Sequence, residues 1–83
     1  MDEVQTAVDA LGKLGLTSYE ARCFVALAQI THGTAREVAR VADVPRSRVY
    51  ETMERLGERG LIEIQHAEPL VFRSVSVETA VNV

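Results

Sequence analysis

The chain of 83 residues carries 12 acidic residues against nine Lys and Arg, a formal net charge of −3, and 47% of its residues are hydrophobic. These values indicate an ordinary folded protein and exclude a disordered chain. No apolar run approaches the roughly 20 residues that a membrane helix needs, and the N-terminus is acidic, unlike a signal peptide. We therefore expect a cytoplasmic protein with no membrane partner, folded as one small domain over residues 1–83.

The middle of the chain differs in charge from its two ends. Residues 1–33 and 60–83 each sum to −2, whereas residues 34–59 hold six Arg against five acidic residues, a balance of +1. Up to Tyr50 the balance of this middle segment is +2. Basic charge is therefore concentrated in one segment, although the net charge of the whole chain would repel an anionic partner.

The first predicted helix covers residues about 3–14 and ends at Gly15. Its apolar residues recur at spacings of three and four, which places them on one helix face. They are Val4, Ala7, Val8, Leu11 and Leu14. Such a face must be covered, and two alternatives stay open: it packs on its own domain, or part of it contacts a second subunit.

Two further helices begin at capping boxes, in which a Thr hydroxyl and a Glu carboxylate each accept a backbone N–H at the helix start. Thr17 to Glu20 opens a helix over 17–30, and Thr34 to Glu37 opens a short helix over 34–42. Cys23 falls on the apolar face of the first of these helices. As the single cysteine it makes no internal disulfide, and we expect it to pack in the core.

His32, beside Gly33, is expected to be a solvated or helix-capping histidine. No other His or Cys lies at a metal-ligand spacing from it. We therefore expect no metal site.

The helix predicted over 45–59 is marked at both ends. Pro45 suits the first helical turn, and Gly60 suits the left-handed position after the helix end. Val49, Met53 and Leu56 form the stripe predicted to be buried. Ser47 and Glu51 lie opposite that stripe on the helical wheel, with Arg48 and Arg55 on one shoulder and Tyr50 on the other.

A short helix, a tight turn and this second helix together make a helix-turn-helix pattern. That arrangement places the N-terminal half of the second helix in the major groove of DNA. After Gly60 the period changes from 3.6 to 2, which predicts a hairpin over residues about 61–75. Ile62, Ile64 and Phe72 are its expected anchors on the helices, and residues 76–78 suggest the start of another short helix. The expected fold class is mainly α with a small β-hairpin, a winged helix-turn-helix.

Three segments of the chain resemble a known family. They are Leu14 to Arg22 (LGLTSYEAR), Val44 to Glu51 (VPRSRVYE) and Leu56 to Ile62 (LGERGLI). In this order, over about residues 10–80, they resemble the N-terminal DNA-binding domain of the TrmB family of archaeal transcriptional regulators. The resemblance implies a winged helix-turn-helix that binds operator DNA as a homodimer, with the helix over 45–59 in the major groove. It also implies that Arg46, Ser47, Arg48 and Tyr50 face the DNA.

The chain departs from the family in two respects. Family members often carry a basic wing near the positions of Leu70 and Val71, which are apolar here, and Glu68 occupies the wing tip. Wing contact with phosphates therefore depends on His66 and Arg73. Family members also commonly have a C-terminal sugar-binding domain, and these residues include no such sugar effector domain.

Each candidate DNA-binding residue has an expected role. Arg48 is the candidate for bidentate contact with guanine, while Arg46 and Arg55 are expected to contact the backbone. Ser47 and Tyr50 suit phosphates or base edges. Glu51 either accepts from a cytosine amino group or pairs with Arg55 four residues on.

The start of the helix at Thr34, with Arg36 in its first turn, offers N–H groups and positive charge to a phosphate.

A second class of function is a winged-helix protein-protein interaction module in a larger transcription or other assembly. The acidic flanks and the non-basic wing favour this alternative, and the arginine cluster disfavours it. An enzyme is not expected, because the sequence has no nucleophile–base pair, no glycine-rich phosphate loop and no metal-ligand cluster. No cofactor is expected, and the expected partner is double-stranded DNA.

Overall fold

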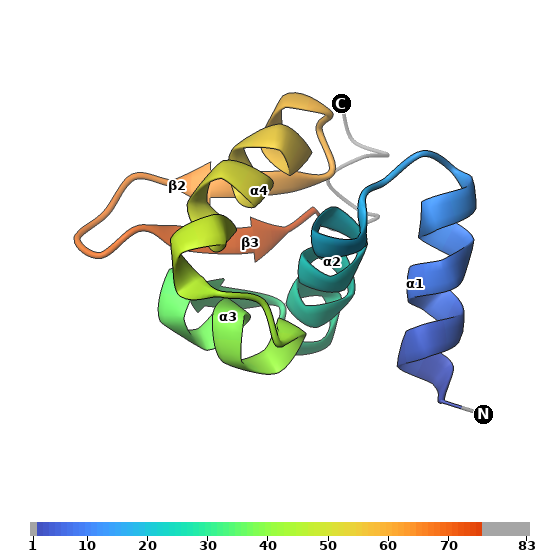
Figure 1. The fold of residues 1–83 in the computed structure, drawn as a ribbon. Coiled ribbons are helices and arrows are strands. Elements are labelled where there is room, and N and C mark those ends of the chain that lie inside the picture. Colours follow the sequence, from blue (N-terminus) through green and yellow to red (C-terminus); the bar gives the residue numbers. More distant parts are fainter. Residues whose placement is uncertain (1, 76–83) are drawn as a thin grey trace.

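The computed structural model describes residues 2–75 of the chain, and the helix suggested at residues 76–78 lies outside them. The elements are α1 (Glu3–Lys13), α2 (Ser18–Ile30), β1 (His32–Thr34), α3 (Ala35–Ala42), α4 (Arg46–Glu58), β2 (Ile62–Gln65) and β3 (Val71–Ser74). Figure 1 shows α2, α3 and α4 grouped against the sheet, with α1 alongside α2. The predicted winged helix-turn-helix class is confirmed, and each helix agrees with its predicted bounds to within one residue.

Both capping boxes are present. The backbone N–H of Glu20 donates to the Thr17 hydroxyl at 3.1 Å, and the Thr17 N–H donates to the Glu20 carboxylate at 2.7 Å. Thr34 and Glu37 repeat the arrangement at 3.3 and 2.9 Å. Each box pairs N–H groups that the first turn of a helix would otherwise leave without partners. The starts of α2 and α3 are therefore fixed by local sequence.

The sheet has three strands in the order β1-β3-β2, all antiparallel, where only a two-stranded hairpin was predicted. The added strand pairs His32 with Arg73 and Thr34 with Val71. His32 is exposed, as expected, but it belongs to this strand, and Thr31 occupies the helix C-cap instead. A strand of three residues is too short to show an alternating pattern, so sequence periodicity missed it. Its pairing supports the wing, because two strands alone are marginal in water.

Gly33 is the close-approach point of the added strand. A Cβ built on Gly33 would lie 2.9 Å from the Ile30 side chain, a distance that real Cβ atoms essentially never show. Gly60 has φ of 75°, the left-handed conformation predicted for the residue that follows α4. Gly33 is therefore required because a side chain does not fit there, and Gly60 because the backbone is left-handed there.

The core lies between α2, α3, α4 and the sheet. The predicted stripe of α4 is fully buried at Val49, Met53 and Leu56. Ile62 and Phe72 anchor the hairpin in this core as expected, while Ile64 is partly buried against it. These contacts fix the direction of α4 relative to the wing.

Cys23 is fully buried in the same core, as expected from its place on the helix face. Burial away from water disfavours the thiolate and raises the pKa of Cys23 to about 11, despite the opposing charge of Arg22. The thiol therefore behaves as a small apolar group.

Helix α1 is the least buried helix among the described residues, because none of its residues is fully buried. Ala7, Val8 and Leu11 are partly covered, whereas Val4 is exposed. Leu14, predicted to share their face, is the C-cap residue and is 78% exposed. The helix ends one residue earlier than expected, so Leu14 leaves the helical wheel. The domain itself covers only part of this apolar face. No helix of the described residues has the length and hydropathy needed to cross a membrane.

Candidate nucleic-acid interface

The turn between α3 and α4 is built by three successive residues. Asp43 adopts the left-handed conformation with φ of 56°, which ends α3. Val44 is buried and its N–H donates to the Ala39 carbonyl at 3.1 Å. Pro45 is extended and precedes the first residue of α4. Pro45 thus takes the N-cap position, just before the helical position expected for it.

Arg22 of α2 ties this turn to the rest of the domain. Its guanidinium donates to the Ala42 carbonyl at 3.2 Å and to the Asp43 carbonyl at 2.6 Å. Carbonyls at a helix end lack partners within the helix, and a positive charge there also complements the helix dipole. Arg22 therefore holds the turn that leads into α4, a role that the sequence analysis did not assign.

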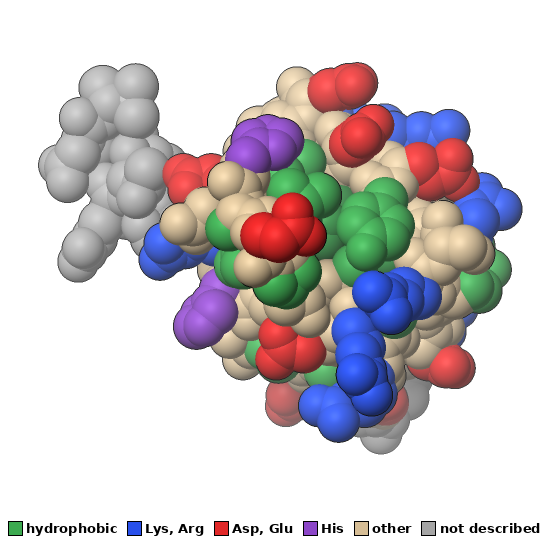
Figure 2. Space-filling model, turned by 90° about the vertical axis from the view of Figure 1, so that its left-hand side faces the viewer, with side chains coloured by type: hydrophobic (Ala, Val, Ile, Leu, Met, Phe, Trp, Pro, Cys, Tyr) green, Lys and Arg blue, Asp and Glu red, His purple; other side chains and the backbone are tan. Residues whose placement is uncertain are grey.

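The first two turns of α4 project predicted DNA-facing residues from the domain. Arg46, Ser47 and Arg48 are all exposed, and Tyr50 is 40% exposed. Figure 2 views the molecule from the side of the wing and shows Lys and Arg side chains gathered on this face, with acidic side chains around it. A positively charged, convex helix start is the feature that a major groove accepts.

Arg48 is held by two neighbours. Its Nε lies 2.6 Å from the Glu51 carboxylate, and its guanidinium carbon lies 5.5 Å from the centre of the Tyr19 ring. The pairing of Glu51 with Arg55 that the sequence left open is not formed. Glu51 pairs instead with Arg48, three residues back on the same surface of α4. Since Glu51 engages Nε, the two terminal nitrogens of Arg48 remain available for a base edge.

Arg55 and Tyr50 lie on opposite sides of α4, as the helical wheel predicted. Arg55 and Arg48 line a hollow of about 270 Å³ between α4 and the start of α2. Ser18 and Tyr19 form the other wall of this hollow. Tyr50 faces the wing, where its ring meets Phe72 edge to face at 6.4 Å between centroids. Positive charge is therefore biased toward the α2 side of the helix.

Thr34 and Arg36 differ in how available their side chains are for contact with a phosphate. The Thr34 side chain is occupied by the capping box, since its hydroxyl also lies 3.1 Å from the Glu37 carboxylate. Those contacts lower the pKa of Glu37, chiefly through the hydrogen bond from the Thr34 backbone. Arg36, two residues further on in the first turn of α3, is exposed. At the start of α3 the Arg36 side chain is therefore more available for a phosphate contact than the Thr34 side chain.

The two wing candidates are not brought together. His66 lines a pocket between the wing and α4, whereas Arg73 lies beside His32 in a hollow that does not include α4. Neighbouring residues of a strand point to opposite faces, and Phe72 takes the inner face. A single phosphate therefore does not contact both His66 and Arg73.

Tyr19 is the contact that the sequence analysis missed. Tyr19 is partly buried against the core, and its ring also faces the Arg48 guanidinium. An aromatic residue in the first turn after a capping box was the available signal, but its partner is distant in sequence. No cluster of three metal-binding side chains forms among residues 2–75.

These features define a class of protein. Helices α2, α3 and α4 around a small sheet, with an exposed arginine-rich start of α4 beside a wing, form a winged helix-turn-helix of the kind found in DNA-binding transcriptional regulators. The family model described as "Sugar-specific transcriptional regulator TrmB" matches residues 11–78. The chain belongs to this family.

Known relatives agree with that assignment. The HTH-type sugar sensing transcriptional regulator TrmBL1 of Pyrococcus furiosus is 29% identical over 68 residues, which cover 82% of this chain and 20% of that protein. The uncharacterized protein YrhO of Bacillus subtilis is 37% identical over 62 residues, which cover 75% of this chain and 22% of that protein.

A solved structure of TrmBL2, described as an archaeal chromatin protein with a novel mode of DNA binding, superposes with a TM-score of 0.85. The sequences are 28% identical, and the match covers 96% of this chain and 32% of TrmBL2. The chain thus spans about a fifth to a third of the length of these relatives. These relatives are transcriptional regulators or DNA-binding proteins where their names state a role, and none is named as an enzyme.

Proposed function

We propose that the chain is a sequence-specific, double-stranded DNA-binding transcriptional regulator that inserts α4 into the major groove. The observation that carries this proposal is the free surface at the start of α4. Arg46, Ser47 and Arg48 project outward, while the opposite stripe of the helix is buried. Arg46 and Arg55 would contact phosphates, and Arg48 would read a base edge. The archaeal source and cytoplasmic location expected from the sequence belong to the same proposal.

A homodimer is the second part of the proposal. Helix α1 keeps Val4 exposed, and Ala7, Val8 and Leu11 are only partly covered. A small domain gains stability when a partner covers such a surface. A two-fold dimer would place two copies of α4 on one face of a duplex, about one helical turn apart.

Selection of bound DNA from a random pool tests both parts. The expected consensus contains two half-sites related by two-fold symmetry, with centres about 34–36 Å apart on B-form DNA. A consensus with a single half-site would contradict the homodimer but would still support sequence-specific DNA binding. If no sequence is enriched, the proposal of sequence-specific binding is wrong.

The alternative function is a protein-protein interaction module. The apolar wing at Leu70 and Val71 and the acidic outer residues around α4 favour it. Titration into mixed-sequence duplex at two salt concentrations separates the functions, since binding to phosphates weakens steeply with salt. A salt-sensitive complex supports the regulator. The absence of any complex at low salt supports the interaction module.

A further inference from the structure

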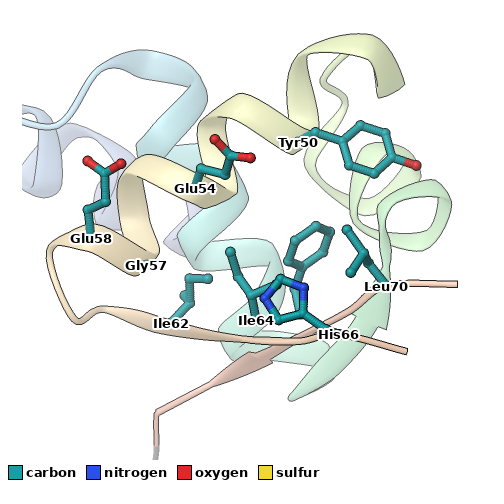
Figure 3. Close-up of a pocket in the computed structure, with 9 residues that line it drawn as sticks. Tyr50, Glu54, Gly57, Glu58, Ile62, Ile64, His66 and Leu70 are labelled. Atoms are coloured by element: carbon teal, nitrogen blue, oxygen red, sulfur yellow. The ribbon is translucent and has the colours of Figure 1, made fainter. Parts of the chain in front are cut away.

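A pocket of about 450 Å³ lies between α4 and the wing, on the side of the helix away from the Arg48–Tyr19 contact. Figure 3 shows Ile62 and Ile64 of the wing facing α4 across it, with Tyr50 at one end. Its size falls within the range of about 300–1,000 Å³ that is usual for small-molecule sites. The proposed DNA contacts of Arg46, Arg48 and Arg55 do not use this space.

The inner wall of the pocket is apolar. Ile62 and Phe72 are buried, and Ile64 and Leu70 are partly buried beside them. An aromatic or aliphatic group of a ligand would gain free energy by displacing water from this surface. The edge-to-face contact of Tyr50 with Phe72 gives the pocket an aromatic end.

The outer rim of the pocket is acidic. Glu54 and Glu58 both line it and are separated by one turn of α4. Like charges at this spacing repel each other. Among the described residues, the ion pairs join Arg22 to Asp43 and Arg48 to Glu51, so neither carboxylate of the rim is neutralised by a partner. A cation at the rim would be attracted by both.

Gly57 keeps the pocket open. It lies inside α4, where Gly is less stable than Ala because its backbone is freer in the unfolded chain. A Cβ at this position would lie 3.5 Å from the Ile64 side chain, an ordinary contact, so the fold does not exclude a side chain here. A larger side chain on Gly57 would occupy the space between α4 and β2.

We propose that this pocket, defined by Gly57, Ile64 and the Glu54–Glu58 rim, binds a small organic cation with an apolar body, such as an aryl-alkyl ammonium ion. The apolar body lies against Ile62, Ile64 and Phe72, and the ammonium group lies between the two carboxylates. This site lies beside the proposed DNA-facing surface and shares two candidate residues with it, Tyr50 and His66. Where the proposed DNA function holds, the bound cation offsets two carboxylates that repel phosphates and so raises the affinity for duplex.

The test uses phenethylammonium as the probe and phenylacetate as its anionic counterpart, without DNA. Titration of the isotope-labelled chain is followed by amide and methyl chemical shifts. We expect shifts centred on Gly57, Ile64 and His66, and at least about tenfold tighter binding of the cation than of the anion. Because no DNA is present, this result is independent of the proposed DNA function. Failure to bind duplex would leave it unchanged.

Variants locate the site and its charge preference. The double variant Glu54→Gln, Glu58→Gln should remove the preference for the cation, whereas Glu63→Gln, an exposed glutamate of β2 outside the pocket, should keep it. Gly57→Leu should abolish binding of both probes, with its amide spectrum as the check on folding. The glutamine variants, which alter exposed side chains, keep the test valid if that variant fails to fold.

Three outcomes would overturn the proposal. The first is equal affinity for the cation and the anion. The second is chemical-shift changes centred away from α4 and β2. The third is changes at the pocket residues that depend on protein concentration and not on the probe. The last would mean that a second copy of the chain occupies the pocket.

Discussion

Arg48 lies between an anion and an aromatic ring. Glu51 fixes one edge of its guanidinium, and Tyr19 lies against its face. Two such contacts reduce the conformational freedom that a long side chain would otherwise lose on binding. We therefore interpret Glu51 as a positioning residue that directs Arg48, and we expect the two residues to act as one unit.

Replacement of Arg48 by Ala should remove discrimination at one base position of the selected site, at a cost of about 1–3 kcal/mol. Binding to operator variants that differ at single base pairs measures this loss. Arg59→Ala is the matched control, because it removes the same charge from the far end of the same helix. Equal loss of affinity for every variant operator would instead assign Arg48 to the phosphate backbone.

The Glu51 contact predicts non-additive effects. Glu51→Ala should reduce discrimination at the same base position as Arg48→Ala, and the double variant should lose no more than Arg48→Ala alone. A double-mutant cycle on operator discrimination measures the coupling. Additive losses would show that Glu51 reads a base by itself, the alternative that the sequence analysis considered.

At the scale of single elements, the turn between α3 and α4 depends on Arg22. Arg22→Ala removes two hydrogen bonds from a charged donor to helix-end carbonyls, which should lower the free energy of unfolding by about 1–3 kcal/mol. Urea unfolding measures the change.

Asp43→Asn is the control for the ion pair of the same arginine. The Asp43 side chain is 98% exposed and lies 3.4 Å from Arg22, so this exposed pair should contribute less than about 1 kcal/mol. Asn also tolerates the left-handed conformation of this position. A larger loss in Asp43→Asn than in Arg22→Ala would mean that the ion pair, not the carbonyl contacts, holds the turn.

The capping box of α3 predicts a pH dependence. Hydrogen bonds from Thr34 hold the pKa of Glu37 below its unfolded value. Their contribution to stability is therefore complete above the unfolded pKa and is lost as the pH falls through the folded pKa. Glu37→Gln, which replaces the carboxylate by an amide that does not titrate, should be less stable than the wild type near neutral pH, and the difference should shrink in acid.

Urea unfolding over a series of pH values measures the difference, and Thr34→Ser, which keeps the hydroxyl, should follow the wild type. A difference between wild type and Glu37→Gln that does not change with pH would refute the role of the Glu37 carboxylate.

The elements that the sequence predicted well are those encoded by neighbouring residues. Capping boxes, Pro45, Gly60 and the stripe of α4 all act within a few residues, so the four helices and the hairpin could be predicted. Strand β1 could not, because its three residues gain their structure by pairing with β3, about forty residues away. Helix caps are local events, whereas strand pairing depends on the tertiary fold.

The candidate site was predictable as a surface but not in its contacts. The helical wheel placed Arg48 and Arg55 on one side and Tyr50 on the other, and the structure agrees. The wheel leaves two positions within reach of Glu51, one turn in either direction, and side-chain conformation decides between them. Contacts between helices, such as that of Tyr19, also require the packed structure.

At the scale of the whole molecule, the distribution of charge matters more than its sum. The chain is acidic overall, yet its arginines gather at the start of α4 and beside α2, on the side away from Glu54 and Glu58. Such a distribution orients a duplex even where the net charge repels it.

Arg55→Ala tests the general attraction to phosphate. It should weaken binding to all sequences alike and reduce the slope of log affinity against log salt by about one unit, because one phosphate contact is lost. Titrations of specific and unrelated duplexes over a range of salt concentrations measure both effects. A loss confined to one operator sequence would assign Arg55 to base readout instead.

The central claim is that the start of α4 contacts DNA. The most direct test is a titration of the isotope-labelled chain with the selected duplex, followed residue by residue through backbone amide shifts. We expect the largest shifts at residues 46–50, with smaller shifts at the starts of α2 and α3. Unchanged signals at 46–50, with the largest shifts on α1 or on the outer face of the sheet, would contradict it.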